Sequence, residues 1–302
     1  MGENMGNKNV KKIALILVAC LTVVGVASTT WAYVGKRREI KAEELRIEKE
    51  KKEEEETKRK EEEEKKKYNV GVSNEGKKYT YDAKKVAEKL KNYDYSNNGE
   101  KVVFLTFDDG ASVTNTPKVL DILKENDVKA TFFVLGECVA NGGDRAKELI
   151  KREFNEGHAI GNHSYSHDMS KLYPGRVLDI KAFKEDFEKN EQFLKEILGE
   201  NFTTKVIRCP GGYGSWKKME PLDKYLKESD MTSIDWNALN ADAEGKKKNA
   251  KELANFAIKT SEGKEMVVVL MHDTYSKEET VKALPKIIKY FKDNGYEFKT
   301  LS

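Results

Sequence analysis

The larger part of this chain carries almost no net charge. Positions 68–302 contain 38 basic and 38 acidic side chains, and the overall charge of +3 comes from the residues before them. A neutral region of this size gives no electrostatic reason to expect a nucleic acid as substrate or partner.

Cysteine and histidine are also scarce, with three and four residues among 302. Cys20 lies in an uncharged segment, which leaves Cys138 and Cys209, each near the end of a predicted strand. One disulfide between them and two free thiols are both open. Three of the four histidines fall in the motifs described below, and the fourth, His158, is interpreted as structural.

Charged residues are absent from positions 13–34, a run of 22 residues that follows a short basic N-terminus (1–12). A helix of that length is about 33 Å long and spans a bilayer, so we expect a transmembrane anchor. A cleaved signal peptide is an alternative, and Leu17–Cys20 resembles a lipoprotein box in which Cys20 would be lipidated. Basic residues flank the run on both sides, so charge leaves the orientation open. The function inferred below favours a single-pass protein of the cell membrane with its catalytic domain outside.

Charge is then concentrated in positions 36–67, where 27 of 32 residues are charged. Many glutamates precede a lysine or arginine by four positions, as Glu54 precedes Lys58, and such pairs support a solvated helix. We expect residues 35–67 to form a charged helical stalk; a disordered stalk is the alternative, while the apolar residues make no heptad for a coiled coil. Residues 68–100 are predicted to be a linker with one short helix at Ala83–Leu90.

From residue 101 onward, short apolar runs alternate with amphipathic stretches. The predicted strands are Val102–Phe107, Ala130–Leu135, Ala159–Asn162, Lys205–Arg208, Thr232–Trp236, Met266–His272 and Tyr296–Leu301. The predicted helices between them are Pro117–Asn126, Asp144–Glu156, Asp179–Leu198, Pro221–Glu228, Asn249–Ser261 and Lys277–Asn294. This repeated βα pattern predicts an α/β domain over 101–302, with about seven parallel strands in a barrel.

Two short motifs carry the chemistry. Asp108 and Asp109 end the first apolar run, and His163 and His167 lie 54 and 58 positions after Asp109. One aspartate and two histidines are the ligands of a catalytic zinc site with a position left for water, and the second aspartate can take the proton of that water. The spacing of four between the histidines lets both imidazoles reach one point from a single turn. The pattern predicts a metal-dependent hydrolase.

Other polar residues fall at the carboxyl ends of different predicted strands. Arg208, Asp235 and His272 each end or follow such a strand, as Asp108 and His163 do. In a parallel barrel these ends converge on one face, where such enzymes perform their chemistry. Five separate pieces of chain are therefore expected to meet in one pocket.

Five sequence motifs, taken in order, resemble those of the polysaccharide deacetylases, also called the NodB-homology or family 4 carbohydrate esterases. The motifs are Thr106–Gly110, His163–His167, Arg208–Gly212, Asp235–Trp236 and Leu270–Asp273. The resemblance covers about 200 residues of the chain. Within the family, the chain is similar to membrane-anchored bacterial peptidoglycan N-acetylglucosamine deacetylases. It implies a distorted, incomplete (β/α) barrel and the removal of acetyl groups from N-acetylated sugar polymers.

The resemblance also implies a role for each matching residue. Asp109 would bind a divalent metal, most simply Zn²⁺, together with the two histidines of the second motif. Asp108 would be the general base, oriented by Arg208. His272 would be the general acid that protonates the departing amine, supported by the carboxylate of Asp235.

A second group of residues would contact the substrate. The backbone N–H of Gly211, where many relatives have tyrosine, would bind the oxyanion. Trp236 and Leu270 would line the groove for the acetyl methyl group and the sugar. Tyr213 and Trp216 are open between sugar stacking and loop packing.

The expected activity is hydrolysis of the acetamide of N-acetylglucosamine in peptidoglycan, with release of acetate. De-O-acetylation of an acetylated polysaccharide is the alternative within the family. A module that only binds wall glycan is an alternative of another class, but intact candidates for metal ligands, base and acid argue against it.

Overall fold

The computed structural model describes residues 36, 37, 41, 43–57, 59 and 69–302 of the chain. Two compact units are present, residues 1–64 and residues 65–302. Among the described residues, no helix is both long enough and apolar enough to cross a membrane. The predicted anchor at 13–34 lies outside the described residues.

The described residues of the first unit are helical. Exposed ion pairs follow the helix: Arg46 lies 3.0 Å from Glu43 and 3.5 Å from Glu50, and Lys52 lies 2.7 Å from Glu48. Each such pair contributes only about 0.3–0.5 kcal/mol, so the helix depends on many of them together. Lys58 and residues 60–67, which carry most of the other predicted pairs, lie outside the described residues.

The second unit is built on one sheet in which every strand pair is parallel. Its strands, in spatial order, are β8 (Thr232–Ser233), β7 (Val206–Ile207), β5 (Ala159–Asn162), β4 (Thr131–Val134), β3 (Val102–Asp108), β10 (Met266–His272) and β9 (Ala238–Leu239). An eighth strand, β11 (Glu297–Phe298), pairs with the first two residues of β3. Within the described part, β8 and β9 end the order without pairing to each other, so the barrel is open between them. The predicted incomplete barrel of about seven parallel strands is confirmed.

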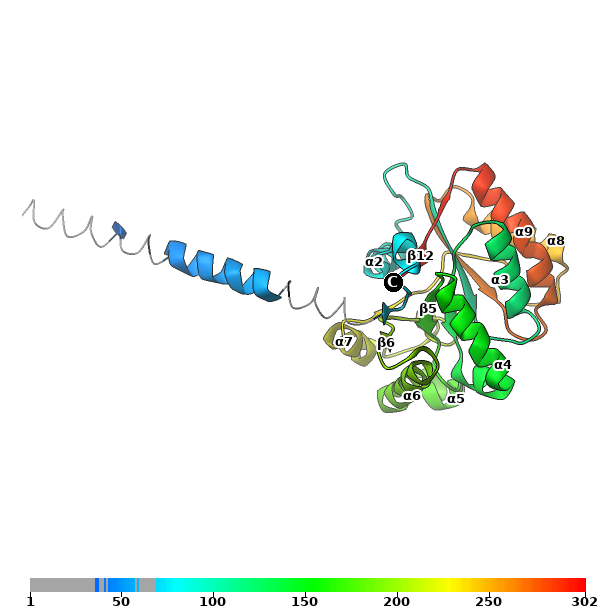
Figure 1. Ribbon diagram of the computed structural model, residues 1–302, viewed down its shortest axis with the longest axis horizontal. Coiled ribbons are helices and arrows are strands. Elements are labelled where there is room, and N and C mark those ends of the chain that lie inside the picture. Colours follow the sequence, from blue (N-terminus) through cyan, green and yellow to red (C-terminus); the bar gives the residue numbers. More distant parts are fainter. Residues whose placement is uncertain (1–35, 38–40, 42, 58, 60–68) are drawn as a thin grey trace, which may run out of the picture. The chain divides into compact units, whose positions relative to one another are not determined.

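Helices surround the strands of this unit (Figure 1). The main ones are α3 (Thr116–Glu125), α4 (Gly136–Asn155), α6 (Ile180–Leu198), α7 (Glu220–Glu228), α8 (Ala250–Ser261) and α9 (Glu278–Asp293). Side chains fix where several of them begin. Asp179 accepts hydrogen bonds from the first-turn N–H groups of α6, and Asn249 and Glu252 form a capping box at the start of α8. Such caps contribute about 1 kcal/mol each, and α6 and α8 begin within one residue of their predicted starts. The predicted start of the helix at Asp144–Glu156 is wrong, since α4 begins at Gly136 and continues through a non-helical residue, Gly143.

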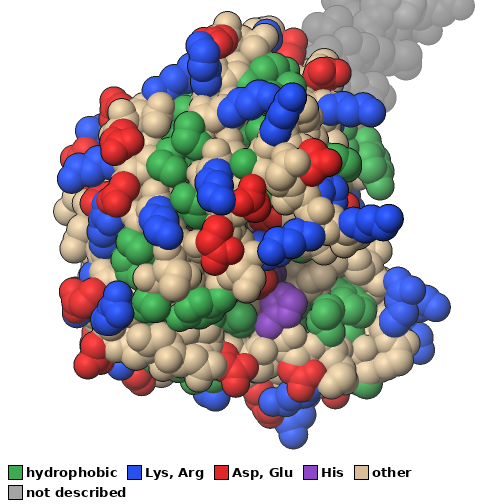
Figure 2. All heavy atoms as spheres, turned by 90° about the vertical axis from the view of Figure 1, so that its right-hand side faces the viewer, with side chains coloured by type: hydrophobic (Ala, Val, Ile, Leu, Met, Phe, Trp, Pro, Cys, Tyr) green, Lys and Arg blue, Asp and Glu red, His purple; other side chains and the backbone are tan. Residues whose placement is uncertain are grey.

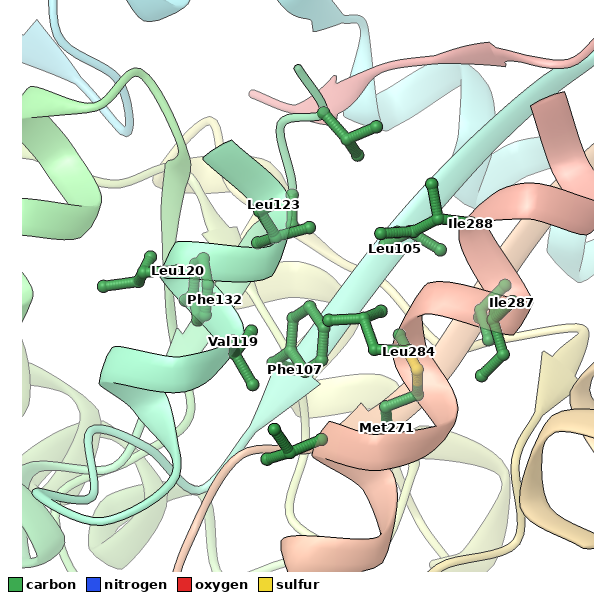
Figure 3. Packing of buried hydrophobic residues seen from close by; sticks show 14 of the residues in the cluster. Leu105, Phe107, Val119, Leu120, Leu123, Phe132, Met271, Leu284, Ile287 and Ile288 are labelled. Carbon is green, nitrogen blue, oxygen red and sulfur yellow. The ribbon is translucent and has the colours of Figure 1, made fainter. Parts of the chain in front are cut away.

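Alternation along β3 and β10 sends side chains to two different environments. Leu105, Phe107 and Met271 point outward and pack against α3 and α9, as Figure 3 shows. Phe104 and Val268 point into the barrel and join a second apolar cluster. By the same alternation, the side chains of Asp108 and His272, the last residues of β3 and β10, lie at the carboxyl end of the barrel interior.

Residues 69–100 were predicted to be a linker, and the structure corrects this. The predicted short helix is present as α2 (Ala83–Lys91), but it packs against the interior cluster through Ala83 and Val86. Two short strands hold the segment to the domain, since β1 (Asn69–Val70) pairs with β6 (Phe202–Thr203) and β2 (Thr80–Tyr81) pairs with β12 (Thr300–Leu301). The folded domain therefore begins about thirty residues before position 101.

Cys138 and Cys209 are free thiols. Cys209 is buried, and Cys138 is partly buried near the carbonyl oxygen of Ala111. Burial raises the pKa of Cys138 to about 11 and that of Cys209 to about 12, so both are protonated at neutral pH. The alternative of a disulfide between them does not apply.

Glu153 on α4 is a buried carboxyl group without a hydrogen-bond partner on either oxygen. Burial, together with the charge of Asp273, raises its pKa well above the ordinary value of 4.5. The folded protein therefore keeps a proton that the unfolded chain releases as the pH rises above about 4.5, so stability falls with rising pH in that range.

Replacing Glu153 with Gln removes this titration and should flatten the loss of stability at higher pH. We expect the variant to gain stability relative to the wild type as pH rises from 5 to 8, by at most ~1.4 kcal/mol per pH unit. Denaturant unfolding at several pH values measures the difference. A difference that stays constant across this range would contradict the assignment.

Candidate active site

The carboxyl ends of β3 and β10 bring two of the predicted residues side by side. Asp108 and His272 are the last residues of these strands and face each other in the strand register. Asp108 is buried, and His272 retains a small exposed area. Chain segments 164 positions apart thus meet at one end of the barrel.

Arg208 holds Asp108 from inside the barrel. Its Nη1 donates to Asp108 Oδ1 at 2.7 Å and to Thr106 Oγ1 at 2.8 Å, and its Nε donates to the carbonyl oxygen of Ile234 at 2.9 Å. The guanidinium lies 4.1 Å from the ring centre of Phe133 and is fully buried. A buried cation needs this full set of partners, and the second oxygen of Asp108 stays available to the site.

Asp109, His163 and His167 form a compact cluster beside Asp108. Asp109 Oδ1 lies 3.4 Å from His163 Nε2 and 3.7 Å from His167 Nε2. One ligand atom from each residue lies within 4.8 Å of the others. Ligand atoms around a tetrahedral zinc ion, at bond lengths of ~2.0–2.2 Å, are separated by about 3.3 Å.

Two further observations fit a cation at this cluster. Asp109 Oδ1 is buried and has no hydrogen-bond partner, which is costly for a carboxylate unless a cation satisfies it. His163 Nδ1 lies 2.8 Å from the carbonyl oxygen of Arg208, so Nδ1 carries the proton and Nε2 presents its lone pair to the cluster. A carboxylate with two imidazoles suits zinc and several other divalent ions.

Electrostatics within the cluster favour a charged carboxylate. Burial raises the pKa of Asp109, but its ionisable neighbours, among them the protonated His272 and Lys277, lower it overall. Burial also lowers the pKa of His163, against the opposing charges of Asp108 and Asp109. Ionised carboxylate and neutral imidazole are the forms that bind a metal.

A tight loop, and not a helical turn, presents the two histidines. Asp186 on α6 accepts hydrogen bonds from the N–H groups of Tyr165 and Ser166, both at 3.0 Å. Ser164 Oγ accepts from the N–H of His167 at 3.0 Å, and His167 itself has a φ of 54°. These bonds bend the chain so that both rings face Asp109. Sequence reasoning missed Asp186, since an acidic residue on an amphipathic helix looks like a solvent-facing one.

Gly110 and Asp273 fix the chain on the other side of the metal ligands. A side chain at Gly110 would collide with the carboxyl group of Asp273. That group accepts a hydrogen bond from Thr116, and burial raises its pKa to about 7. The first motif therefore needs glycine at position 110, because a larger residue would collide with Asp273. Without a side chain at this position, the loop after Asp109 can lie against the end of β10.

His272 is paired with Asp242, a residue that sequence reasoning did not identify. His272 Nδ1 lies 2.7 Å from Asp242 Oδ1, and its backbone N–H donates to Asp242 Oδ2 at 3.0 Å. Thr280 donates to the same carboxylate at 2.6 Å. Burial alone lowers the pKa of His272, but the hydrogen bond and charge of Asp242, with Asp108 and Asp109, raise it to about 9. His272 is therefore protonated at neutral pH, and Nε2 faces Asp109 at 3.9 Å.

The prediction that Asp235 supports His272 is wrong. Asp235 Oδ1 accepts the backbone N–H of Tyr213 at 3.0 Å, and its carbonyl oxygen accepts from Arg208 Nη2 at 3.3 Å. The reason is the strand order: Asp235 follows β8 at one edge of the open barrel, whereas Asp242 follows β9, which pairs with β10. Asp235 instead fixes the loop that carries Gly211.

The remaining predicted residues border the same site. Gly211 has a φ of 75°, and within the described residues its N–H donates no hydrogen bond. Trp236 packs against Gly212, and Leu270 faces the barrel interior between Val268 and His272. Tyr213 is anchored by a 2.7 Å hydrogen bond from its hydroxyl to Asp223.

Trp216 resolves one alternative in favour of packing. Its ring stacks on Tyr173 at 4.1 Å between centres, and its Nε1 donates to the carbonyl oxygen of Pro210 at 2.8 Å.

Figure 2 shows histidine side chains in a hollow of the surface, with apolar side chains on both sides. The cluster is therefore reachable from solvent.

Known proteins are similar to this chain in sequence. The family described as polysaccharide deacetylase matches residues 95–229. A peptidoglycan-N-acetylglucosamine deacetylase of Bacillus cereus is 32% identical over 206 residues, which cover 68% of this chain and 88% of that protein. The chain belongs to the polysaccharide deacetylase family.

Solved structures of this family have the same fold. A CE4 esterase of Streptococcus mutans has a TM-score of 0.70 and 38% identity, covering 78% of this chain and 98% of that chain. The catalytic domain of a peptidoglycan N-acetylglucosamine deacetylase from Eubacterium rectale has a TM-score of 0.59 and 31% identity, covering 69% and 91%. Membership in the polysaccharide deacetylases makes this chain one of a family of hydrolases that remove acetyl groups from carbohydrates.

Asp242 offers a direct test of how this deacetylase site holds its histidine. Replacing Asp242 with Asn removes the charge that raises the pKa of His272, so we expect that pKa to fall from about 9 to near or below 6.5. The alkaline limb of the activity profile should move to lower pH in parallel. A titration of the histidine ring protons by NMR measures the pKa.

The matched control is Asp235→Asn, which changes the charge of the carboxylate that sequence reasoning favoured. Because Asp235 bonds Tyr213 and not His272, the pKa of His272 should stay near 9 in this variant. If Asp235→Asn lowered this pKa and Asp242→Asn did not, the pairing described above would be incorrect.

Proposed function

We propose that this protein is a metal-dependent deacetylase of N-acetylated cell-wall glycan, acting on N-acetylglucosamine units of peptidoglycan. One observation supports this most strongly. Asp108 and the protonated His272 stand on neighbouring strands, on either side of the cluster of Asp109, His163 and His167. Amide hydrolysis requires a base and an acid on either side of a set of metal ligands.

Asp108 acts as the general base. Its Oδ1 is held by Arg208, and its Oδ2 lies 3.7 Å from His163 Nε2, beside the metal ligands. A water molecule between the cluster and Asp108 transfers a proton to Oδ2 as it attacks the carbonyl carbon of the acetamide. The hydrogen bond from Arg208 orients the carboxylate for this transfer.

Asp109, His163 and His167 would hold a divalent ion, which would supply Lewis acidity to polarise the acetyl carbonyl and to lower the pKa of water. The negative charge that develops on the carbonyl oxygen is bound by the N–H of Gly211, in a loop fixed by Asp235. His272 then donates its Nε2 proton to the departing nitrogen while Asp242 stabilises the cation. The C–N bond breaks, and acetate and a free amine leave.

Two relatives support the choice of substrate. The Bacillus cereus protein and the Eubacterium rectale domain are both named peptidoglycan N-acetylglucosamine deacetylases. De-O-acetylation of an acetylated polysaccharide is the second candidate, because an ester would be attacked by the same groups.

The anchor predicted at 13–34 and the charged helix after it fit a glycan outside the membrane. In this proposal the protein crosses the cell membrane once and the stalk holds the catalytic domain facing the wall. Protease added to intact protoplasts should then digest the catalytic domain, whereas protection from protease would contradict the orientation.

Metal removal tests the activity itself. The full chain is treated with a chelator and then with Zn²⁺, and acetate is measured with peptidoglycan and with acetylxylan. We expect acetate release to stop on chelation and to return with Zn²⁺, with one free amine formed per acetate from peptidoglycan. Acetate release that persists in the stripped protein would exclude metal dependence, and release from acetylxylan alone would favour the esterase.

Replacing Asp108 with Asn should lower acetate release by about 10²–10⁴-fold, because the amide cannot accept the proton. Zinc content should remain near one per chain, since the metal ligands are untouched. His167→Ala is the complementary variant and should lose zinc and activity together, while Tyr165→Phe in the same loop should keep both. Metal analysis with acetate assay distinguishes the cases, and full turnover in Asp108→Asn would remove this residue from the mechanism.

A further inference from the structure

The pair of His272 and Asp242 has one member outside the sheet. His272 ends β10, so the strand register fixes its backbone. Asp242 lies beyond β9, whose pairing with β10 ends at the hydrogen bond from the N–H of Asn240 to the carbonyl oxygen of Leu270, at 3.2 Å. The residues after Asp242, 243–247, are exposed. The sheet alone therefore does not set the direction of the Asp242 carboxylate.

Two lysines hold the backbone of this loop. Lys277 Nζ donates to the carbonyl oxygen of Asp242 at 2.8 Å, and Lys248 Nζ donates to that of Ala241 at 3.1 Å. Ala241 has a φ of 60°, a left-handed conformation that is uncommon for residues other than glycine. Both lysines thus support a sharp bend, but they bind main-chain oxygens and do not orient the carboxylate.

Thr280, in the first turn of α9, binds the carboxylate itself. Its Oγ1 donates to Asp242 Oδ2, and Asn240 Nδ2 donates to the same Oγ1 at 3.1 Å. An amide nitrogen can only donate, so the one proton of the hydroxyl is left for Asp242. Asn240 Oδ1 in turn accepts the N–H of Asp242 at 3.1 Å. Thr280 and Asn240 are fully buried, so water does not compete for these bonds.

The two oxygens of Asp242 therefore have separate partners. Oδ2 accepts the hydroxyl of Thr280 and the backbone N–H of His272, and Oδ1 is left for the Nδ1–H of His272. These contacts fix the plane of the carboxylate, and the carboxylate fixes the imidazole ring. Thr280 is itself held firmly, because α9 packs between α3 and α8 (Figure 1).

We propose that Thr280 is a positioning residue for the general acid: through Asp242 it orients Nε2 of His272 toward the departing nitrogen. The inference rests on the proposed function, in which His272 donates a proton. Thr280 lies eight positions after His272, outside the five motifs and beyond residue 229, where the family match ends. Without its hydroxyl, the carboxylate can rotate, and proton transfer to the leaving nitrogen should slow.

Thr280→Val tests this role, because it keeps the shape of the side chain and removes the hydroxyl. With Zn²⁺ and a soluble hexamer of β-1,4-linked N-acetylglucosamine, kcat should fall about tenfold at unchanged KM, since a hydrogen bond to a charged group is lost and no substrate contact is. Thr280→Ser returns the hydroxyl and should stay within about twofold of the wild type. Thr300→Val is the matched control: Thr300 is equally buried, and its hydroxyl has no hydrogen-bond partner among the described residues, so kcat should be unchanged.

A double-mutant cycle separates positioning from a general loss of structure. In the Asp242→Ala background, Thr280→Val should cause no further loss of kcat, because the residue through which Thr280 acts is gone. Losses that multiply in the double variant would mean that Thr280 acts independently of Asp242, and they would overturn the inference.

An NMR measurement separates this inference from the proposed function. The chain has four histidines, so ¹⁵N-labelling of histidine resolves the Nδ1–H proton of His272, assigned by its absence in His272→Gln. A proton held by a buried carboxylate exchanges slowly with water; Thr280→Val should speed this exchange, whereas Thr280→Ser and Thr300→Val should not. Faster exchange in Thr280→Val, with no acetate released from any glycan by the wild type, would sink the function and leave the contact through which Thr280 holds His272. Acetate release with Thr280→Val and Thr300→Val alike in kcat and exchange would overturn the positioning role and leave the function.

Discussion

The buried guanidinium of Arg208 is the contact on which the arrangement of the site depends. A fully buried cation costs several kcal/mol unless its partners are complete, and here they are Asp108, Thr106, two backbone carbonyl oxygens and the face of Phe133. The carbonyl oxygen of Arg208 also receives the Nδ1–H of His163. One residue therefore orients both the candidate base and a candidate metal ligand, which ties the position of each to the other.

Charge in the site is organised as two ion pairs on either side of the metal cluster. Arg208 with Asp108 forms one pair, and His272 with Asp242 forms the other. In the first pair the carboxylate faces the cluster, and in the second the imidazolium does. The site thus offers a substrate one carboxylate that can accept a proton and one imidazolium that can donate a proton. A reaction that needs both a base and an acid requires the two at a single pH.

Much of this arrangement could be predicted from the sequence. Buried β-branched runs identified the long strands, and β5 and β10 have the predicted bounds because strand pairing and hydrophobic pattern agree there. The ligand cluster followed from an aspartate and two histidines in short motifs, and the pairing of Arg208 with Asp108 followed from the family resemblance. Asp242 did not, since β9 has two residues and leaves no periodic signal, so the aspartate beside Trp236 looked like the better candidate. Residues 69–100 look like a linker because their polar composition hides strands that pair with segments more than 100 positions away.

Asp108 and His272 are opposite one another in the register of two paired seven-residue strands. Their separation is set by backbone hydrogen bonds in the middle of the sheet and not by any loop. Loops around the mouth can accordingly change in length and composition during evolution, as adaptation to a new polymer demands, without altering the distance over which protons must travel.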